Sequence, residues 1–489
     1  MPQDKEKLAG SESKAIAKRA EDYSQWYIDI IDVAGLAEHG PVKGTMVIKP
    51  YGYAIWENIQ KILDAKFKEL GVQNAYFPLF IPESFLKKEK EHVEGFSPEL
   101  AVVTHGGGKK LEEPLVVRPT SETIMYSTFA KWIHSYRDLP LLINQWANVV
   151  RWEMRPRLFL RTTEFLWQEG HTAHKTADEA KEYALMILND VYKWFAQEYL
   201  AIPVLVGQKS QNERFAGALS TFTIEALMQD GKSLQMGTAH DLSDHFAKSF
   251  EVMYLDEKGE QQFVFQTSWG VSTRLIGGIV MSHSDDNGLV LPPKIAPIEL
   301  VIVPIFRNAD DAQLQEAKKI AENLKNTFRI KLDERDNLRV GEKFFEWEKK
   351  GVPLRLEIGP KDLAAGQCVL VRRDTGEKIV CPLSDVEKTV KDLLEKIQTN
   401  LFESALARQK QNTVSVDNWD AFVESLEKGG YISAFWCERA ECELEIKEKT
   451  KATTRCLPFD AEEETGKHVC VHCGKAAPQG KRWIFARAY

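Results

Sequence analysis

The stretch Arg151–Gly170, RWEMRPRLFLRTTEFLWQEG, places four arginines among aromatic residues. The chain of 489 residues carries a formal net charge of −8, so this cationic cluster contrasts with the rest of the sequence. A solvated, salt-bridged face is the common explanation of such clusters. However, LPLLINQWANVVRWE and TTEFLWQEG both alternate and are rich in branched or aromatic residues, which predicts two strands joined by a loop. The arginines are therefore expected on strand and loop, not along a solvated helix.

The segments on either side of this stretch predict a mixed α and β domain. Upstream, apolar residues recur at helical spacing from Ile55 to Phe67, Gly71 ends the helix, and the strand-like NAYFPLF follows. Pro78 within it cannot donate to a sheet, so it belongs at an edge or at a special position such as an interface. Downstream, we expect a helix over His174–Leu200, strands in SLQMGTAHDLS and QFVFQTSWGVSTR, and a helix in LIGGIVMSH.

The chain length and its proline-rich breaks indicate about three domains. Three prolines in GLVLPPKIAP resist both helix and sheet and predict a boundary. Beyond it, PIELVIVPI, IKLDER, PLRLEIGP and CVLVRR alternate with helical patterns, which predicts a small α/β domain, and a lysine- and glutamate-rich helix runs over Ser384–Gln411. The predicted divisions are a polar N-terminal tail at 1–20, a first domain at 21–292, the α/β domain at 293–400 and a C-terminal domain of mixed α/β character at 401–489.

Composition favours a soluble cytoplasmic protein. Hydrophobic residues make up 43 % and charged residues 28 % of the chain, which are globular values. No apolar run reaches the ~18 residues that span a bilayer, and the polar start lacks the apolar core of a secretory signal. The acidic total does not exclude a nucleic-acid partner, because such a partner needs only a local basic face.

Four of the seven cysteines form two pairs near the C-terminus, in CERAEC and CVHC. Pairs at such spacing in an intracellular-type chain predict a tetrahedral structural zinc rather than disulfides, although two such pairs can also exist without metal. The predicted ligands are Cys437, Cys442, Cys470 and Cys473, with His468 and His472 as possible substitutes. Cys368, Cys381 and Cys456 are expected to be buried or free thiols.

The opening stretch resembles motif 2 of the class II aminoacyl-tRNA synthetases, a strand, loop and strand that hold ATP. VVRPTSETIMY, NQWANVVRWEMRP, ALMQDGKSLQMGTAH, TSWGVSTRLIGG, GLVLPPKIAP, EWEKKGVPLRLEIGPKDL and KRWIFARAY extend this resemblance to prolyl-tRNA synthetases of the archaeal and eukaryotic type, over nearly the whole chain. It implies an α+β catalytic domain with an antiparallel sheet and helices, then an α/β anticodon-binding domain and a small α/β zinc-containing domain. It also implies L-proline, ATP and tRNA(Pro) as substrates, Mg²⁺ for catalysis, and a homodimer formed through motif 1 around Pro78.

Activation of an amino acid by ATP brings a carboxylate against an α-phosphate, and fixed cations must offset their repulsion. The arginine fork binds such oxygens in a bidentate manner, and the reaction needs no protein nucleophile or general base. By resemblance, Arg151 bridges carboxylate and α-phosphate, and Arg274, before a helix, holds the γ-phosphate. The other implied residues are Glu153 for adenine or the tRNA end, Phe165 for adenine stacking, and Arg161, Thr162, Gln235, Thr238 and Ser272 for nucleotide contacts. Arg155 and Arg157 are as consistent with tRNA phosphates as with solvent.

Proline requires a site for a cationic secondary amine and a compact apolar ring. By resemblance, Thr120 and Glu122 in RPTSE take the amine protons, whereas the same Thr-Ser-Glu could be a capping box ahead of a helix. Trp167, Phe215 and His240 would form the wall around the ring.

The resemblance also implies roles for the last residue of the chain and for residues of the α/β domain. A C-terminal tyrosine carboxylate, here that of Tyr489, folds back towards the catalytic pocket. Glu348, Lys361 and Lys378 are candidates for reading the anticodon, with ordinary surface charge as the alternative. Only about a hundred residues separate Gly170 from Arg274, too few for the large editing insertion of bacterial-type enzymes.

Two alternative functions remain at this stage. A threonyl or glycyl ligase would share the class, but threonyl enzymes use a zinc in the catalytic domain and no cysteine precedes Cys368. A non-catalytic paralogue would be marked by the loss of Arg151 or Arg274, and both residues are present.

Overall fold

The structure is a computed structural model, and it describes residues 15–86 and 100–489. Residues 1–14 of the predicted N-terminal tail lie outside this range. The chain divides into two compact units: one comprises the residues up to Glu38 with Ile48–Ala54 and His283–Ile397, and the other comprises His39–Val47, Ile55–Ser282 and Gln398–Tyr489. None of the helices within the described ranges has the length and apolar character needed to cross a membrane.

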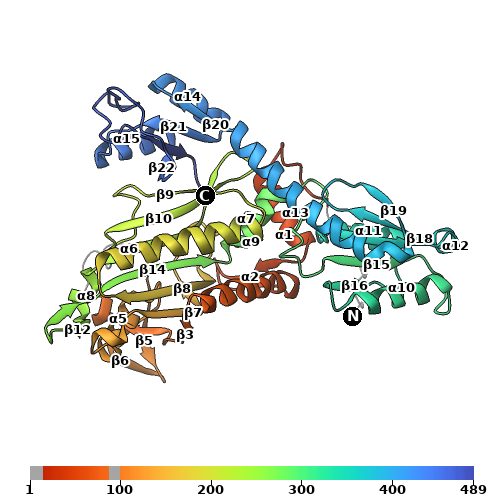
Figure 1. The fold of residues 1–489 in the computed structure, drawn as a ribbon, viewed down its shortest axis with the longest axis horizontal. Coiled ribbons are helices and arrows are strands. Elements are labelled where there is room, and N and C mark those ends of the chain that lie inside the picture. Colours follow the sequence, from red (N-terminus) through yellow and green to blue (C-terminus); the bar gives the residue numbers. More distant parts are fainter. Residues whose placement is uncertain (1–14, 87–99) are drawn as a thin grey trace, which may run out of the picture. The chain divides into compact units, whose positions relative to one another are not determined.

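An eleven-stranded sheet is the framework of the second unit, in the order β20-β21-β23-β22-β9-β10-β11-β14-β8-β7-β3 (Figure 1). The strands from β9 to β7 pair antiparallel, as the sequence predicts, and the edge strand β3 joins β7 in parallel. Their bounds are β3 (Gln73–Asn74), β7 (Leu141–Val150), β8 (Glu164–His174), β9 (Leu205–Gln208), β10 (Ser220–Leu227), β11 (Ser233–Ser243) and β14 (Phe265–Ser272).

The C-terminal strands extend this sheet instead of forming a separate one. β22 pairs antiparallel with β9, where Leu457 faces Gln208 and Pro458 faces Gly207. A side chain at Gly207 would meet the backbone of Leu457 at 2.3 Å, so this close strand approach requires glycine. The elements are β20 (Thr413–Val416), β21 (Tyr431–Phe435), β22 (Thr453–Pro458), β23 (Arg482–Ala486), α14 (Trp419–Lys428) and α15 (Ala440–Thr450).

Helices cover the part of the sheet formed by β8, β11 and β14. The predicted helix over 174–200 is present as α6 (Ala177–Met186), a π-helical segment η3 (Ile187–Lys193) and α7 (Trp194–Glu198), packed against β8, β11 and β14 (Figure 1). Trp269 of β14 contributes to this packing, because its ring contacts that of Tyr192 in η3, with the centroids 6.4 Å apart, and fills the space that a side chain at Gly170 would occupy. The remaining helices here are α2 (Pro50–Glu69), α3 (Glu83–Leu86), α5 (Glu122–Trp132), η2 (Tyr136–Asp138), α8 (His245–Phe250) and α9 (Arg274–His283).

The prediction of one continuous strand in NAYFPLF is wrong. β3 ends at Asn74, and β4 (Phe80–Pro82) belongs to a different, three-stranded sheet with β5 (Ala101–Gly106) and β6 (Lys109–Val117). Between β3 and β4 the backbone N–H of Phe77 donates to the Gln145 side chain at 2.6 Å, a tertiary contact that replaces a sheet bond. Pro78 is exposed in this connection and belongs to neither strand.

No separate insertion domain lies between β8 and β14, a region in which every residue is described. Residues 175–264 form the strands β9, β10 and β11 of the main sheet, the helical segments α6, η3, α7 and α8, and the short hairpin of β12 (Met253–Leu255) and β13 (Gln261–Phe263).

The first unit contains the predicted α/β domain. Its five-stranded sheet has the order β16-β15-β17-β18-β19, in which β16, β15 and β17 are parallel and the last two strands are antiparallel. The strands are β15 (Leu300–Pro304), β16 (Ile330–Leu332), β17 (Leu354–Ile358), β18 (Gln367–Arg372) and β19 (Lys378–Pro382). The helices are α1 (Tyr23–Val33), α10 (Ala312–Leu324), α11 (Val340–Lys349) and α12 (Pro360–Ala364), and η4 (Leu383–Asp385) leads to α13 (Val386–Gln411). β1 (Ala37–His39) and β2 (Met46–Ile48) form a separate two-stranded sheet.

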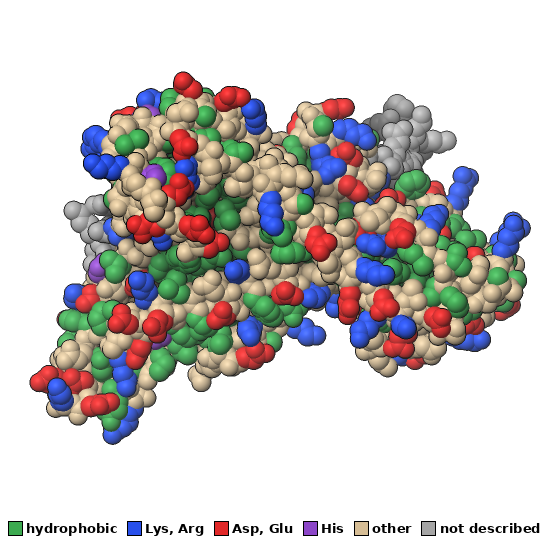
Figure 2. Space-filling view, turned by 45° about the horizontal axis from the view of Figure 1, so that its top comes forward, with side chains coloured by type: hydrophobic (Ala, Val, Ile, Leu, Met, Phe, Trp, Pro, Cys, Tyr) green, Lys and Arg blue, Asp and Glu red, His purple; other side chains and the backbone are tan. Residues whose placement is uncertain are grey.

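Surface charge is mixed on the face seen in Figure 2, where basic and acidic side chains are interspersed. The net negative charge is therefore spread over this face rather than gathered in one acidic field. Mixed surfaces of this kind favour solubility without strong long-range attraction or repulsion.

Candidate active site

The opening stretch folds as a strand, a loop and a strand. β7 pairs with β8 in a register that places Val150 opposite Glu164, and residues 151–163 form the connection. The backbone of Arg151 donates to the carbonyl of Thr163 at 2.8 Å and closes the base of the loop. Leu158, Phe159 and Leu160 are buried, so the loop is anchored by an apolar segment between its arginines. The arginine side chains of the loop are therefore attached to a well-anchored backbone.

A cavity of about 280 Å³ lies over this strand pair and the neighbouring strands β11 and β14. All the residues predicted for proline and ATP line it: Thr120, Glu122, Arg151, Glu153, Arg161, Thr162, Phe165, Trp167, Phe215, Gln235, Thr238, His240, Ser272 and Arg274. These residues come from five separate regions of the sequence, and the antiparallel sheet brings them together. The lining also contains residues that sequence reasoning did not select, among them Glu169, His171, Lys209, Glu213 and Arg214.

Arg151 is fixed above two aromatic rings. Its Nε donates to the carbonyl of Pro119 at 3.0 Å, and its guanidinium lies 5.6 Å from the ring centroid of Phe165 and 5.4 Å from that of Trp167. Ring faces attract cations, and the carbonyl fixes one edge of the fork. For Arg151, the solvated-face explanation is therefore wrong.

Arg274 begins helix α9 and lies deep in the cavity. Its Nε donates to the carbonyl of Leu160 at 3.1 Å, which ties the start of the helix to the motif 2 loop. Burial, together with the nearby charges of Arg161 and Arg151, lowers the pKa of Arg274 to about 10. The guanidinium remains charged at neutral pH, and three arginines crowd a space that an anion would neutralise. Glu153 provides a local counter-charge, with its Oε1 3.6 Å from Nε of Arg161.

The capping-box interpretation of Thr-Ser-Glu is wrong. Ser121 is the N-cap residue of α5, but its side chain makes no capping bond and instead donates to Oε1 of Glu169 at 2.5 Å. The Thr120 hydroxyl donates to Oε2 of Glu122, and both side chains are buried at the cavity wall. A buried carboxylate directed at a cavity is suited to a cationic amine, which would supply the missing charge.

Glu169 and His171 form a second buried acid–base pair that sequence reasoning missed. The Nε2 atom of His171 lies 3.1 Å from Oε2 of Glu169, and Nε2 of Gln145 donates to Oε1 at 2.7 Å. Burial raises the pKa of Glu169, but the hydrogen bonds and charge of His171 and the bonds from Ser121 and Gln145 outweigh it and hold that pKa below its usual value. A signal was available, because positions 167, 169 and 171 share one strand face with the predicted Trp167.

Phe215 and His240 form a stacked wall on the other side of the cavity. Their ring centroids are 4.6 Å apart with an interplanar angle of 28°. The His240 ring nitrogens contact the hydroxyls of Thr221 at 3.0 Å and Thr238 at 3.2 Å. Burial, with the charges of His171 and Arg151, lowers the pKa of His240 to about 3. The imidazole is therefore neutral at physiological pH and acts as a flat, weakly polar surface.

The remaining arginines of the stretch have different surroundings. Arg155 is exposed, as expected for a side chain in solvent or one that reaches a phosphate. The guanidinium of Arg157 instead lies 5.3 Å from the ring centroid of Tyr489, the last residue of the chain. Tyr489 is held to the catalytic sheet by its backbone N–H, which donates to Ser233 at 3.2 Å, and its hydroxyl donates to Asp230 at 2.6 Å. The chain end thus packs against the catalytic sheet beside the motif 2 loop.

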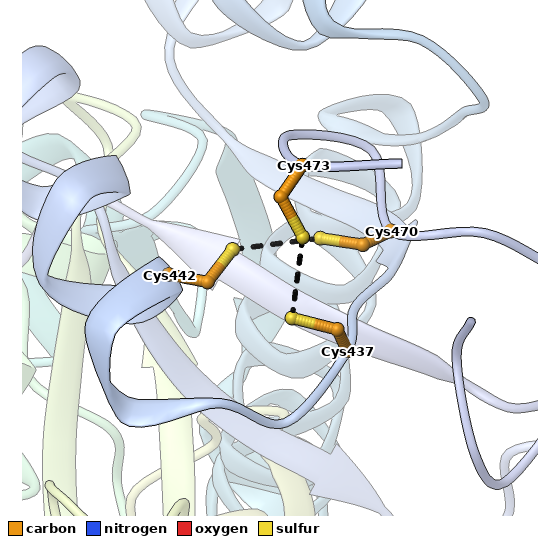
Figure 3. A group of neighbouring side chains, drawn as sticks. All are labelled: Cys437, Cys442, Cys470 and Cys473. Carbon is orange, nitrogen blue, oxygen red and sulfur yellow. Dashed lines mark hydrogen bonds between the residues drawn. The ribbon is translucent and has the colours of Figure 1, made fainter. Parts of the chain in front are cut away.

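The four predicted cysteines converge in the C-terminal domain (Figure 3). Their Sγ atoms all lie within 4.8 Å of one another, and the separations are 3.6 Å for Cys442 and Cys470 and 3.5 Å for Cys437 and Cys473. A tetrahedral zinc with Zn–S bonds of about 2.3 Å requires sulfur separations of about 3.8 Å, whereas a disulfide requires about 2.05 Å. The arrangement fits one ion held by four thiolates.

The alternative histidine ligands do not join this group. His472 Nδ1 lies 3.5 Å from Cys442 Sγ, but its Nε2 contacts Lys449 at 2.9 Å. The ring of His468 stacks on Phe435 at 4.0 Å. The other three cysteines are buried free thiols, as predicted: Cys368, Cys381 and Cys456.

The anticodon candidates are only partly brought together. Glu348 and Lys378 line a cavity of about 190 Å³ in the first unit, which is also lined by Trp347 and Arg373. Lys361 lies exposed on α12 and is not part of this lining. Basic, acidic and aromatic side chains around one cavity could contact the edges and faces of unpaired bases.

Comparison with known families agrees with this architecture. The class II tRNA synthetase core domain (G, H, P, S and T) matches residues 104–283, the anticodon binding domain matches 299–393, and the C-terminal domain of prolyl-tRNA synthetase matches 419–489. The three matches follow one another in the order predicted from the sequence.

Individual relatives resemble the chain over its whole length. It is 55 % identical to a proline–tRNA ligase of Porphyromonas gingivalis, covering 98 % of this chain and 99 % of that one. The identity is 54 % to the proline–tRNA ligase of Chlorobium chlorochromatii, with 97 % and 99 % covered. Among solved structures, the prolyl-tRNA synthetase of Cryptosporidium parvum, complexed with halofuginone and AMPPNP, superposes with a TM-score of 0.93 at 42 % identity and covers 98 % of both chains.

Proposed function

Since this chain belongs to the prolyl-tRNA synthetase family, we propose that the cavity lined by Arg151 and Arg274 is where it activates its amino acid. The chain is a class II proline–tRNA ligase, which joins L-proline to ATP to form prolyl-adenylate and pyrophosphate and then transfers proline to the 3′ end of tRNA(Pro). One observation carries the proposed site: fourteen residues selected from the sequence line a single cavity.

The cationic part of the cavity is suited to the triphosphate and to the transition state. Arg151 would bridge the proline carboxylate and the α-phosphate, where negative charge grows during attack. Arg274 would hold the γ-phosphate, and Arg161, balanced by Glu153, would contact the nucleotide. Because these guanidiniums are already fixed by carbonyls and rings, little reorganisation accompanies the reaction. Phe165 offers a face for adenine, and the nucleotide's polar groups would be met by Thr162, Gln235, Thr238 and Ser272.

The opposite part of the cavity is suited to proline. Thr120 and Glu122 would take the two amine protons, and the flat wall of Phe215 and His240, with Trp167, would enclose the ring. A compact apolar ring against stacked aromatic groups loses little entropy, and the carboxylate pairing fixes its orientation. The proline carboxylate attacks the α-phosphate of ATP and expels pyrophosphate. The ribose hydroxyl of tRNA then attacks the carbonyl of the adenylate and expels AMP, so positioning and charge carry both steps.

Two metal ions complete the proposed enzyme. Mg²⁺, bound with ATP, would neutralise phosphate charge. A structural Zn²⁺ would be held by Cys437, Cys442, Cys470 and Cys473, whose sulfur separations suit it, and the four thiolates leave no open position for catalysis.

The remaining proposals concern assembly and architecture. We propose a cytoplasmic homodimer formed through motif 1, because the exposed Tyr76, Pro78 and Phe80 present apolar surface beside β3 and β4. Glu348, Lys361 and Lys378 are proposed to contact the anticodon, and the carboxylate of Tyr489 to approach the catalytic pocket. The archaeal/eukaryotic type describes the proposed architecture rather than the source, since the curated relatives reported above are bacterial. The proposed domains are 1–20, 21–292, 293–400 and 401–489.

Amino-acid-dependent exchange of pyrophosphate into ATP, measured without tRNA for all twenty amino acids, tests the function. We expect exchange with proline only, because the cavity provides one amine site and a small apolar wall. Exchange with a different amino acid would contradict the proposed pocket. No exchange, with ATP binding intact, would favour the non-catalytic alternative.

A further inference from the structure

One loop separates the proposed proline pocket from the C-terminal domain. Residues 209–219 connect β9 to β10, and Lys209, Glu213, Arg214 and Phe215 from this loop all line the cavity. Phe215 is fixed at its backbone, where its N–H donates to the Thr221 hydroxyl at 2.8 Å, and at its ring by stacking on His240. The position of this part of the pocket wall therefore depends on the path of the loop.

The C-terminal helix α15 holds the start of the loop. Ser210 Oγ donates to Oε1 of Glu443 at 2.8 Å, and the hydroxyl of Thr454 on β22 donates to the same oxygen. Glu443 is 3 % exposed, so these bonds are shielded from water. Further along the loop, Asn212 Nδ2 donates to the carbonyl of Ala440 at 3.2 Å. Ser210 and Asn212 of the loop thus both bond to the C-terminal domain.

A buried ion triad fixes the first loop residue. Arg455 on β22 donates from Nε and Nη2 to the carboxylate of Glu225 at 2.9 to 3.1 Å, and Lys209 Nζ lies 3.2 Å from the same carboxylate. Burial lowers the pKa of Lys209, opposed by the charge of Glu225. Removal of any one member of this triad would leave buried charge that is not fully balanced, so the geometry of the triad is strongly constrained.

We propose that Glu443 and Arg455 of the C-terminal domain are positioning residues for amino-acid binding. They hold the 209–219 loop, and the loop holds Phe215 against His240. The residues proposed to contact the nucleotide lie on the motif 2 loop, β8, β11, β14 and the start of α9, and none of them lies on the 209–219 loop. Loss of the α15 contact should therefore weaken proline binding and spare ATP. This inference rests on the proposed proline pocket and adds a role for the C-terminal domain in it.

The test is a comparison of KM values in pyrophosphate exchange. Glu443→Ala should raise the KM for proline by about tenfold, the size of effect expected from a lost shielded hydrogen bond to a carboxylate. The KM for ATP and kcat should stay within about twofold. Glu443→Gln keeps an acceptor oxygen and should restore most of the proline affinity. Backbone amides of residues 210–217 should exchange faster in Glu443→Ala than in the unmodified chain.

Two further variants make the result decisive. Glu424→Ala removes an exposed carboxylate on α14 that pairs with Lys428, and it should leave both KM values unchanged. Ser210→Ala removes the hydroxyl that bonds to Glu443 and leaves the sequence of α15 unchanged. It should likewise raise the KM for proline and not that for ATP, and it provides the test even if Glu443→Ala does not fold. Equal changes in both KM values, or no change in Ser210→Ala, would overturn the inference. Absence of proline-dependent exchange in the unmodified chain would instead contradict the proposed function.

Discussion

The catalytic cavity and the cysteine cluster hold charge in opposite ways. In the cavity, each key cation has a neutral protein partner: Arg151 bonds to the carbonyl of Pro119, and Arg274 to that of Leu160. In the cluster, the four sulfurs lie mainly against one another, with Cys442 and Cys470 3.6 Å apart. The first region fixes its cations with neutral groups, whereas the second collects ligands whose negative charges only a cation can balance.

Because of this difference, substitutions in the cavity should mainly affect the reaction, and substitutions in the cysteine cluster should mainly affect folding. Strands and backbone carbonyls hold the arginines of the cavity, so removal of one should change the reaction more than the fold. Thiolates that are balanced by a metal contribute to folding directly, so removal of one should change the fold more than the reaction. The expected effects can be ordered by size, beginning with the cavity.

Arg151→Ala should give the largest effect. It removes the group proposed to meet the growing charge between carboxylate and α-phosphate, and loss of one such group costs about 10²–10³-fold in rate, or about 3–4 kcal/mol. Pyrophosphate exchange should fall by that factor or more, while the thermal unfolding midpoint and the sedimentation coefficient of the proposed dimer remain close to those of the unmodified chain.

Arg155→Ala is the matched control for that experiment. Arg155 belongs to the same loop but is exposed and does not line the cavity. Its removal should leave exchange within about twofold, as for most surface substitutions. Retained exchange in Arg151→Ala would remove that residue from its proposed role, and a large loss in both variants would indicate a general effect of loop charge.

Cys470→Ser should give the next effect, in stability. Loss of one thiolate from a four-thiolate site should lower bound zinc and cost at least about 2 kcal/mol of folding free energy. At saturating proline, exchange per folded molecule should stay within about twofold. Zinc analysis and thermal unfolding provide the measurement, and a chelator should lower the midpoint of the unmodified chain but not that of the variant.

The flanking histidine supplies the control for the cluster. His468 is two residues from Cys470 but its ring stacks on Phe435 outside the sulfur group. His468→Ala should retain zinc. An unaltered unfolding midpoint after verified metal removal would refute a structural role for the cluster.

Much of the fold could be predicted because its signals are local. The alternation in LPLLINQWANVVRWE predicts β7, and the helical spacing between Ile55 and Phe67 predicts α2. The junction between β22 and β9 has no local signal, because it pairs residues such as Leu457 and Gln208 that are far apart in the chain. The false strand in NAYFPLF illustrates the same limit, since the bond from Phe77 to Gln145 depends on tertiary structure.

In the candidate site, too, residues with a local sequence signal could be predicted and residues defined by tertiary contacts could not. Residues within recognisable motifs, such as Arg151 and Arg274, could be selected from the sequence and line one cavity. Lys209 and Glu225 could not, because a buried charge is identified by its partner, and Arg455 comes from a different part of the chain. Glu169 could have been found from strand periodicity, since it shares a face with Trp167.

The smallest expected effect concerns His240 and the pH dependence of stability. Its pKa is lowered in the folded chain from 6.5 to about 3, chiefly by burial, so the folded state excludes a proton that the unfolded state accepts. The unfolded state binds more protons between these values, and the His240 contribution is therefore lost as pH falls from about 6.5 towards 3. From pH 7 to 5.5 this single group should cost about 1 kcal/mol of folding free energy.

His240→Gln removes this titration while retaining a polar side chain that can reach the flanking hydroxyls of Thr221 and Thr238. Denaturant midpoints of the variant and the unmodified chain, measured at pH 7 and pH 5.5 with zinc present, give the difference directly. The variant should lose about 1 kcal/mol less on acidification. Because the variant is compared with the unmodified chain at the same pH, any loss of stability caused by acid release of zinc is equal in both and cancels. Equal losses would mean that the cavity already admits a proton at His240, and the wall beside Phe215 would then carry charge.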